Sequence, residues 1–112
     1  MLIMMRKLTL AAICTIAMLP ASQAQQATEV QLTYSNGQFQ PSQVSAPADK
    51  PILFRVKNLD GKAMEFESTS LRVEKVVAAG TEGVINVRAL KAGRYEFYDD
   101  FNDKARGALT VQ

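Results

Sequence analysis

Two stretches of this 112-residue sequence carry side chains that could bind a metal ion, "MEFES" at 64–68 and "YEFYDDFND" at 95–103. Both contain carboxylates, the second adds an amide, and the first begins with a thioether. Carboxylate and amide oxygens suit hard or borderline cations such as Fe²⁺ and Mn²⁺, whereas a thioether favours Cu⁺. The two stretches together predict a metal site whose candidate ligands are Met64, Glu67, Asp99, Asn102 and Asp103.

The same residues have a second interpretation, in which no metal is bound. The acids would form a solvated loop, and exposed pairs with nearby bases would each contribute about 0–1 kcal/mol. Asp99 and Asn102 would cap turns, and Met64 would fill the core because a thioether adapts to irregular gaps. The bases available for such pairs are Lys62, Arg72, Lys104 and Arg106.

Composition excludes several kinds of chemistry. The chain has no histidine, and its one cysteine, Cys14, lies in an apolar N-terminal segment. Beyond that segment, nucleophilic catalysis by cysteine or histidine and a zinc site built on them are excluded. Paired acids such as Glu65 and Glu67 remain, but a domain of 88 residues leaves little room for a substrate cleft. We therefore do not expect an enzyme.

The first 24 residues have the features of an export signal. Arg6 and Lys7 precede the apolar stretch 8–19, and small residues lead to Ala24. The apolar stretch is too short to span a bilayer comfortably. We expect cleavage after Ala24, a periplasmic domain at 25–112 and no membrane insertion. Without Arg6 and Lys7, 11 basic side chains face 11 acidic ones, so no positive field is left to attract nucleic acid.

Short strands are the elements that would position the candidate ligands. Apolar and polar residues alternate in seven or eight segments, separated by glycine, proline, asparagine and aspartate, and no segment has helical spacing. This pattern predicts an all-β fold, an antiparallel Greek-key β-sandwich. Alternate residues of a strand share a face, so Asp99 should point inward with Tyr95 and Phe97. By the same rule, Glu65 and Glu67 should lie on the face opposite Met64.

The order of these segments resembles a cupredoxin-like domain. The resemblance is carried by "FQPSQVSAPADKPILFRVKNLD" at 39–60, "AGTEGVINVRALKAGRYEFYDD" at 79–100 and "RGALTVQ" at 106–112. In that family a copper centre uses two histidines, a cysteine and usually a methionine. The matching positions here are Met64, Asp99, Asn102 and Arg106, so the resemblance implies the fold without a type 1 blue-copper site.

A more specific resemblance is to the small periplasmic cupredoxin-like proteins associated with bacterial iron permeases. It rests on "EFES" at 65–68, "LRVEKV" at 71–76 and the ending "ARG" at 105–107. Asn102 stands where that group usually has histidine. The resemblance implies an accessory of periplasmic iron or copper handling, with a weakly bound copper or iron ion and an iron permease or other metal-handling protein as partner. The alternative is a cofactor-free β-sandwich that serves only as a protein-interaction module.

Overall fold

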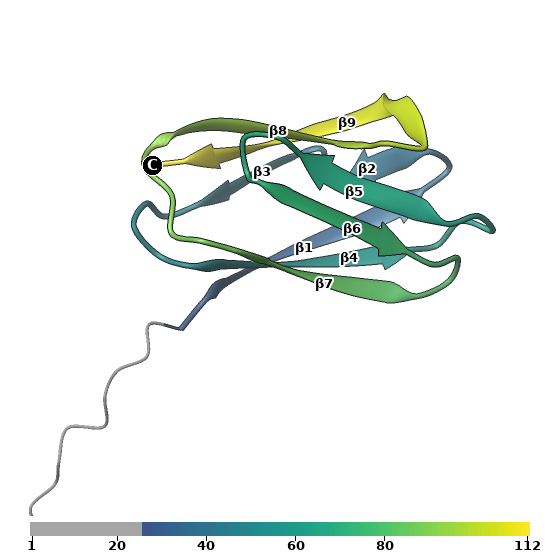
Figure 1. Cartoon of the computed structure of the whole chain (residues 1–112), viewed down its shortest axis with the longest axis horizontal. Coiled ribbons are helices and arrows are strands. Elements are labelled where there is room, and N and C mark those ends of the chain that lie inside the picture. Colours follow the sequence, from purple (N-terminus) through teal and green to yellow (C-terminus); the bar gives the residue numbers. More distant parts are fainter. Residues whose placement is uncertain (1–25) are drawn as a thin grey trace, which may run out of the picture.

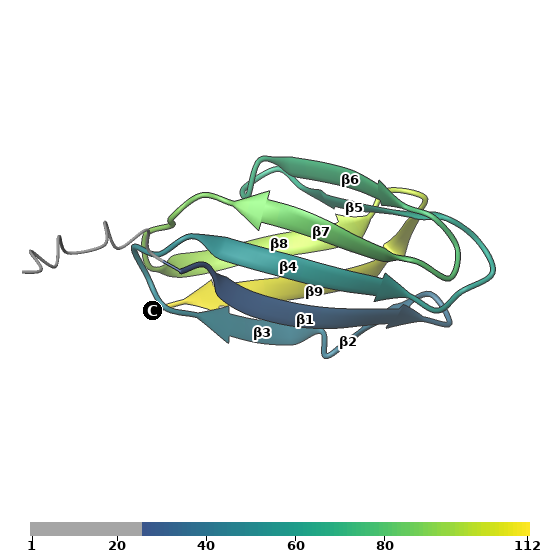
Figure 2. The same cartoon turned by 90° about the horizontal axis from the view of Figure 1, so that it is seen from below.

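The structure, a computed structural model, describes residues 26–112 and folds them into two packed β-sheets (Figures 1 and 2). The predicted signal segment at 1–24 lies outside the described residues. Within 26–112 no helix has the length and apolar character needed to cross a membrane.

Each sheet is built from strands that are distant in the sequence. The four-stranded sheet has the order β2 (Gln38–Gln40), β1 (Thr28–Ser35), β4 (Ile52–Asn58), β7 (Glu82–Val87). The five-stranded sheet has the order β3 (Gln43–Ala46), β9 (Asn102–Val111), β8 (Gly93–Asp99), β5 (Met64–Ser68), β6 (Val73–Val77). The predicted all-β sandwich is confirmed.

Two details differ from the sequence prediction. The described residues form nine strands rather than seven or eight, and two strand pairs, β1–β4 and β3–β9, are parallel. Both differences arise because the segment 38–49 divides near Pro41. Its first part, β2, pairs with β1, whereas its second part, β3, crosses to the other sheet. The chain then returns to the first sheet and β4 runs beside β1 in the same direction.

The β1–β2 connection is the tight turn that the Asn-Gly pair predicts. Asn36 and Gly37 have φ values of 52° and 68°, the left-handed region that suits a two-residue hairpin turn. A Cβ atom on Gly37 would lie 3.0 Å from Asn102 Nδ2, so this turn packs closely against the start of β9. Glycine is favoured here by both its backbone conformation and the limited space.

The inward faces of both sheets meet in an aromatic core. The Phe97 ring lies 5.0 Å from the ring of Phe39 and 5.1 Å from that of Phe66, centroid to centroid, and Phe54 lies 5.3 Å from Phe66. Phe54, Phe66 and Phe97 have no exposed surface. Such packing joins the two layers and positions β1, β5 and β8, the strands that carry Tyr34, Glu65 and Asp99.

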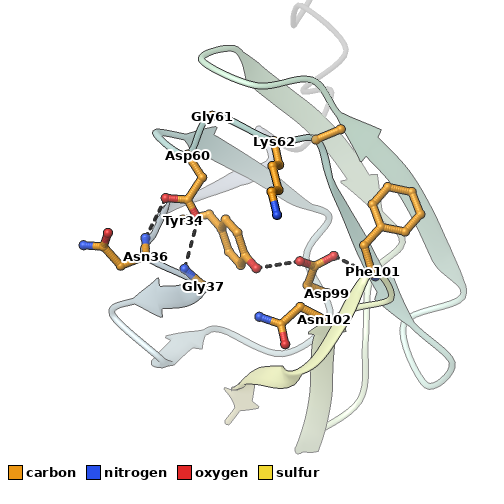
Figure 3. A pocket seen from close by; sticks show the side chains of 10 residues that line it. Tyr34, Asn36, Gly37, Asp60, Gly61, Lys62, Asp99, Phe101 and Asn102 are labelled. Carbon is orange, nitrogen blue, oxygen red and sulfur yellow. Dashed lines mark hydrogen bonds between the residues drawn. The ribbon is translucent and has the colours of Figure 1, made fainter.

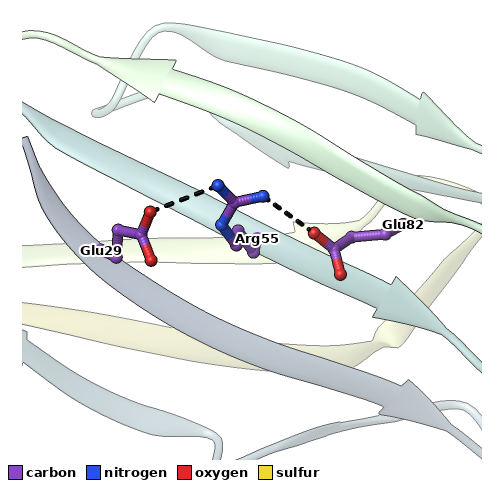
Figure 4. Close-up of polar contacts among 3 residues, drawn as sticks. All are labelled: Glu29, Arg55 and Glu82. Carbon is purple, nitrogen blue, oxygen red and sulfur yellow. Dashed lines mark hydrogen bonds and ion pairs between the residues drawn. The ribbon is translucent and has the colours of Figure 1, made fainter.

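The outer face of the four-stranded sheet carries a small charged ladder (Figure 4). The Arg55 guanidinium lies 3.2 Å from a Glu29 carboxylate oxygen and 3.1 Å from one of Glu82, and thus links three neighbouring strands. All three side chains are more than a third exposed. Water screens such pairs, so each contributes about 0–1 kcal/mol.

Candidate functional site

Three connections meet at one end of the sandwich and enclose a cavity of about 690 Å³ (Figure 3). They are the β1–β2 turn, the β4–β5 loop and the β8–β9 turn. This end is opposite the C-terminus (Figure 1). The lining residues are Tyr34, Asn36, Gly37, Asp60, Gly61, Lys62, Ala63, Asp99, Phe101 and Asn102.

The β4–β5 loop is held in place by two polar side chains at its start. The fully buried Asn58 amide donates to the Lys62 carbonyl at 2.8 Å and to the Val77 carbonyl at 3.1 Å, and its oxygen accepts from the Asp60 N–H at 3.0 Å. The Asp60 carboxylate accepts from the N–H groups of Asn36 and Gly37 at 2.6 and 2.9 Å. This loop is therefore fixed to β6 and to the β1–β2 turn.

The Asp99 carboxylate joins both sheets at this end. One carboxylate oxygen accepts from the Tyr34 hydroxyl at 2.5 Å, and the other accepts from the N–H groups of Glu65 at 2.9 Å and Phe101 at 3.0 Å. Asp99 and Tyr34 are 2% and 3% exposed. Burial, together with the hydrogen bond to the neighbouring Asp99 carboxylate and its negative charge, raises the pKa of Tyr34 to about 12. Tyr34 therefore stays protonated as a donor.

A second group of acids lies on the outer face of the five-stranded sheet. Carboxylate oxygens of Glu65, Glu67 and Asp100 lie within 4.8 Å of one another. Glu74 on β6 is opposite Glu67 in the strand register. We call these four residues the outer acidic cluster. Carboxylates at this spacing match the oxygen ligands that Mn²⁺ and Fe²⁺ accept.

Like charges perturb the titration of this cluster. A hydrogen bond with Glu74, desolvation by burial and the negative charges of the other three acids in the cluster together raise the pKa of Glu65 to about 7. Burial and the charges of Asp100 and Glu74 likewise raise the pKa of Glu67. Glu65 is only 7% exposed.

Basic side chains do not neutralise these acids. The ion pairs within residues 26–112 involve Arg55 and Arg94, and none includes Asp99 or a member of the outer acidic cluster. The Lys62 side chain extends into the cavity (Figure 3) and forms no ion pair within residues 26–112. Arg106 instead lies over the Tyr98 ring, 5.2 Å from its centroid. The ion pairs that a purely solvated loop predicts are thus not formed.

The five predicted metal ligands do not gather at one place. Asp99 and Asn102 line the cavity, whereas Glu67 belongs to the outer acidic cluster. Met64 is fully buried among apolar core residues, which fits the packing interpretation of its thioether. Asp103 is exposed in the irregular start of β9 and belongs to neither group; its carbonyl accepts from Arg106 Nε at 2.9 Å.

Some residues of both groups come from distant parts of the chain and were not predicted from the sequence. Tyr34 reaches the cavity from β1 and Asp60 from the β4–β5 loop, and Glu74 joins the outer acidic cluster from β6. The spacing of Glu65 and Glu67 did place them on one outer face, as predicted. No local pattern indicates that Asp100 and Glu74 approach that face, because this depends on strand pairing.

The residues at the end of the sandwich do not fit a type 1 copper ion. Such a site needs a thiolate and imidazoles, and residues 25–112 contain neither cysteine nor histidine. Asp99, the inward acid, has both carboxylate oxygens engaged by three protein donors. Blue-copper electron transfer therefore has no ligand set here.

Comparisons with known proteins place the fold and the sequence in one group. The family described as cupredoxin-like domain matches residues 8–111. The uncharacterized protein RP394 of Rickettsia prowazekii (strain Madrid E) is 36% identical over 84 residues, which are 74% of this chain and 67% of that protein.

Solved structures agree with this fold at low sequence identity. The metal binding domain of the Streptococcus pneumoniae Cu(I)-exporting P-type ATPase CopA, determined with Cu(I), has a TM-score of 0.65 and 16% identity over 75% of this chain and 84% of that one. Auracyanin A, a blue copper protein of Chloroflexus aurantiacus, has a TM-score of 0.66 and 10% identity over 78% of this chain and 100% of that one. These similarities show a shared fold.

Proposed function

The chain belongs to the cupredoxin-like domain family, and from that premise we propose that it is an exported, non-enzymatic accessory of iron or copper handling in the periplasm. In this proposal it holds a divalent cation weakly, without a type 1 copper site, and passes it to a membrane permease or another metal-handling protein. The basic n-region and apolar stretch of residues 1–24 support export.

The observation that carries the proposal is the outer acidic cluster. Three carboxylates converge within 4.8 Å, with a fourth on the neighbouring strand. Like charges at such distances oppose folding unless a proton or a cation relieves them. Since each charged neighbour that shifts the Glu65 pKa is itself an acid, a divalent cation would relieve this repulsion. Oxygen ligands favour Fe²⁺ or Mn²⁺ over Cu⁺, and Met64, the one thioether within residues 26–112, is buried in the core.

Relatives support a role in metal handling without specifying the metal. One protein of the same fold is described as the metal binding domain of a Cu(I)-exporting ATPase. The "EFES" and "LRVEKV" segments resemble the periplasmic proteins associated with iron permeases, and both contribute acids to the outer acidic cluster, from β5 and β6. Two of the clustered acids, Glu65 and Glu67, lie inside the first segment.

Calorimetric titration of the purified protein tests the metal site. We expect Fe²⁺, added without oxygen, and Mn²⁺ to bind with a Kd below about 100 μM, equivalent to about 5.5 kcal/mol. The double variant Glu67→Gln/Asp100→Asn should weaken binding at least tenfold. Glu96→Gln, an exposed acid on the same sheet outside the cluster, is the matched control and should bind as the wild type. Absence of binding below about 100 μM would reject the metal-carrier role.

A second function, a protein-interaction module, is favoured by one observation. Phe101 and Leu59 are 57% and 54% exposed, and both adjoin the cavity end of the sandwich. Leu59 is tied to β1 by the hydrogen bond from its N–H to the Tyr34 carbonyl at 2.8 Å. Exposed apolar side chains at this end could contact a partner protein.

Crosslinking to a candidate permease in envelope membranes separates the two functions. The interaction function predicts that Leu59→Ser/Phe101→Ser loses the crosslink while metal affinity stays unchanged. Val84→Ser, an exposed residue on the four-stranded sheet, serves as the control and should keep the crosslink. A crosslink that survives in the double variant would exclude this surface as the docking site.

A further inference from the structure

The Asp99 carboxylate connects three strands that are far apart in the sequence, together with the turn that follows β8. It is the last residue of β8, and it accepts from Tyr34 on β1, from the backbone of Glu65 on β5 and from Phe101 in the following turn. Tyr34 belongs to the four-stranded sheet and Asp99 to the five-stranded sheet, so their hydrogen bond spans the two layers (Figure 3). A metal ion with ligands from several loops would join segments in the same way.

Burial makes these contacts strong. Asp99 and Tyr34 are only 2% and 3% exposed. Hydrogen bonds to a charged acceptor strengthen when water is excluded. A buried carboxylate without donors would be very unfavourable. Three donors satisfy this carboxylate, and within the described residues no buried side-chain nitrogen or oxygen lacks a partner.

The same contacts leave Asp99 little capacity to bind a cation. An ionised carboxylate offers about four acceptor positions, and three are used here. The donor set also lacks the thiolate and imidazoles of a copper centre. The cavity beside Asp99 is lined by the Lys62 ammonium as well (Figure 3), which would repel a metal ion.

We propose that Asp99, together with Tyr34, is an internal cross-link that closes this end of the sandwich in place of a metal centre. The end is held by the protein's own hydrogen bonds, so the domain folds without an ion. No metal ion is needed at this end of the sandwich, and any cation that the protein takes up is bound away from Asp99. This inference does not depend on the outer acidic cluster binding a metal.

Thermal unfolding followed by circular dichroism tests the cross-link. Asp99→Asn has the same shape but a weaker acceptor, and we expect it to lower the Tm by roughly 10 °C; Tyr34→Phe should lower it by roughly 5 °C. The double variant should lose less than the sum of the two, because both changes remove the same hydrogen bond. Tyr95→Phe, which loses a hydroxyl bonded to an exposed carbonyl at 2.8 Å, and Asp103→Asn are matched controls with expected shifts below about 2 °C.

Metal dependence provides the second measurement. The Tm of Glu67→Gln/Asp100→Asn, which lacks two ligands of the outer acidic cluster, should be the same in EDTA as in buffer, and neither Cu²⁺ nor Fe²⁺ should restore the Tm of Asp99→Asn. A fall in the Tm of this double variant in EDTA as large as the fall caused by Asp99→Asn would overturn the proposal. So would Asp99→Asn abolishing metal binding while stability is unchanged, or strict additivity of the two variants. If Asp99→Asn fails to fold both with and without added metal ions, the cross-link is supported. Tyr34→Phe then still gives a measurable shift in Tm.

Discussion

Asn58 provides a quantitative test of how the β4–β5 loop is held. Its amide donates to the carbonyls of Lys62 and Val77 at 2.8 and 3.1 Å and accepts from the Asp60 N–H at 3.0 Å, and its side chain is fully buried. Asn58→Ala removes three hydrogen bonds, each worth about 1 kcal/mol, so we expect the free energy of unfolding to fall by about 3 kcal/mol. For a domain of this size that corresponds to a Tm lower by about 12–24 °C.

Urea unfolding monitored by circular dichroism measures this loss directly. Asn86→Ala is the matched control, because Asn86 is an exposed asparagine on β7, and it should change stability by less than about 0.5 kcal/mol. Asn58→Asp keeps the size but turns a carboxylate oxygen toward two carbonyls, so it should be at least as unfavourable as alanine. A loss below about 1 kcal/mol for Asn58→Ala would refute the argument that its side-chain hydrogen bonds hold the β4–β5 loop.

Three further outcomes follow from the packing and charges of the described residues. Gly107→Ala would place a Cβ atom against the Phe97 ring and should cost about 1–3 kcal/mol in urea unfolding, whereas Gly61→Ala, with open space around it, should not; equal losses would contradict this. The pKa of Glu65 is raised from 4.5 to about 7 in the folded protein, so the stability that its protonated form contributes is complete below pH 4.5 and is lost as pH rises through 7. Glu65→Gln should therefore flatten the dependence of the free energy of unfolding on pH between 4.5 and 7. An unchanged dependence would exclude Glu65 as its source. Arg55→Ala removes two exposed ion pairs that water screens, so urea unfolding should change little, and 1 M salt should reduce the change further.

The strands and their faces were predictable from local sequence. Alternation of apolar and polar residues placed Phe97 and Asp99 on one inward face, and both are buried. The same alternation placed Glu65 and Glu67 together on the other face of β5, where their carboxylates meet that of Asp100. The Asn36-Gly37 turn was readable because few residues adopt left-handed backbone conformations. These features depend on neighbours within a few positions, which a sequence displays directly.

The position of each strand within a sheet was not readable in this way. Alternation shows that a strand has two faces but not which strand lies beside it, so the parallel β1–β4 and β3–β9 pairs were not foreseen. The separation of Met64 from Glu67 was predictable, because residues three apart on one strand lie on opposite faces. The meeting of Glu67 with Asp100 was not, because it depends on which strand lies beside β5.

Composition and the alternation of apolar and polar residues predict a β-sandwich without the thiolate and imidazoles of blue copper, because both are properties of the linear chain. The surroundings of the inward Asp99 depend instead on how the two sheets pack. Tyr34 lies 65 positions earlier in the chain and on the other sheet, and its hydroxyl meets the carboxylate because β1 and β8 end at the same end of the molecule. Contacts over such separations follow from how the sheets pack, and alternation along a single strand contains no information about them.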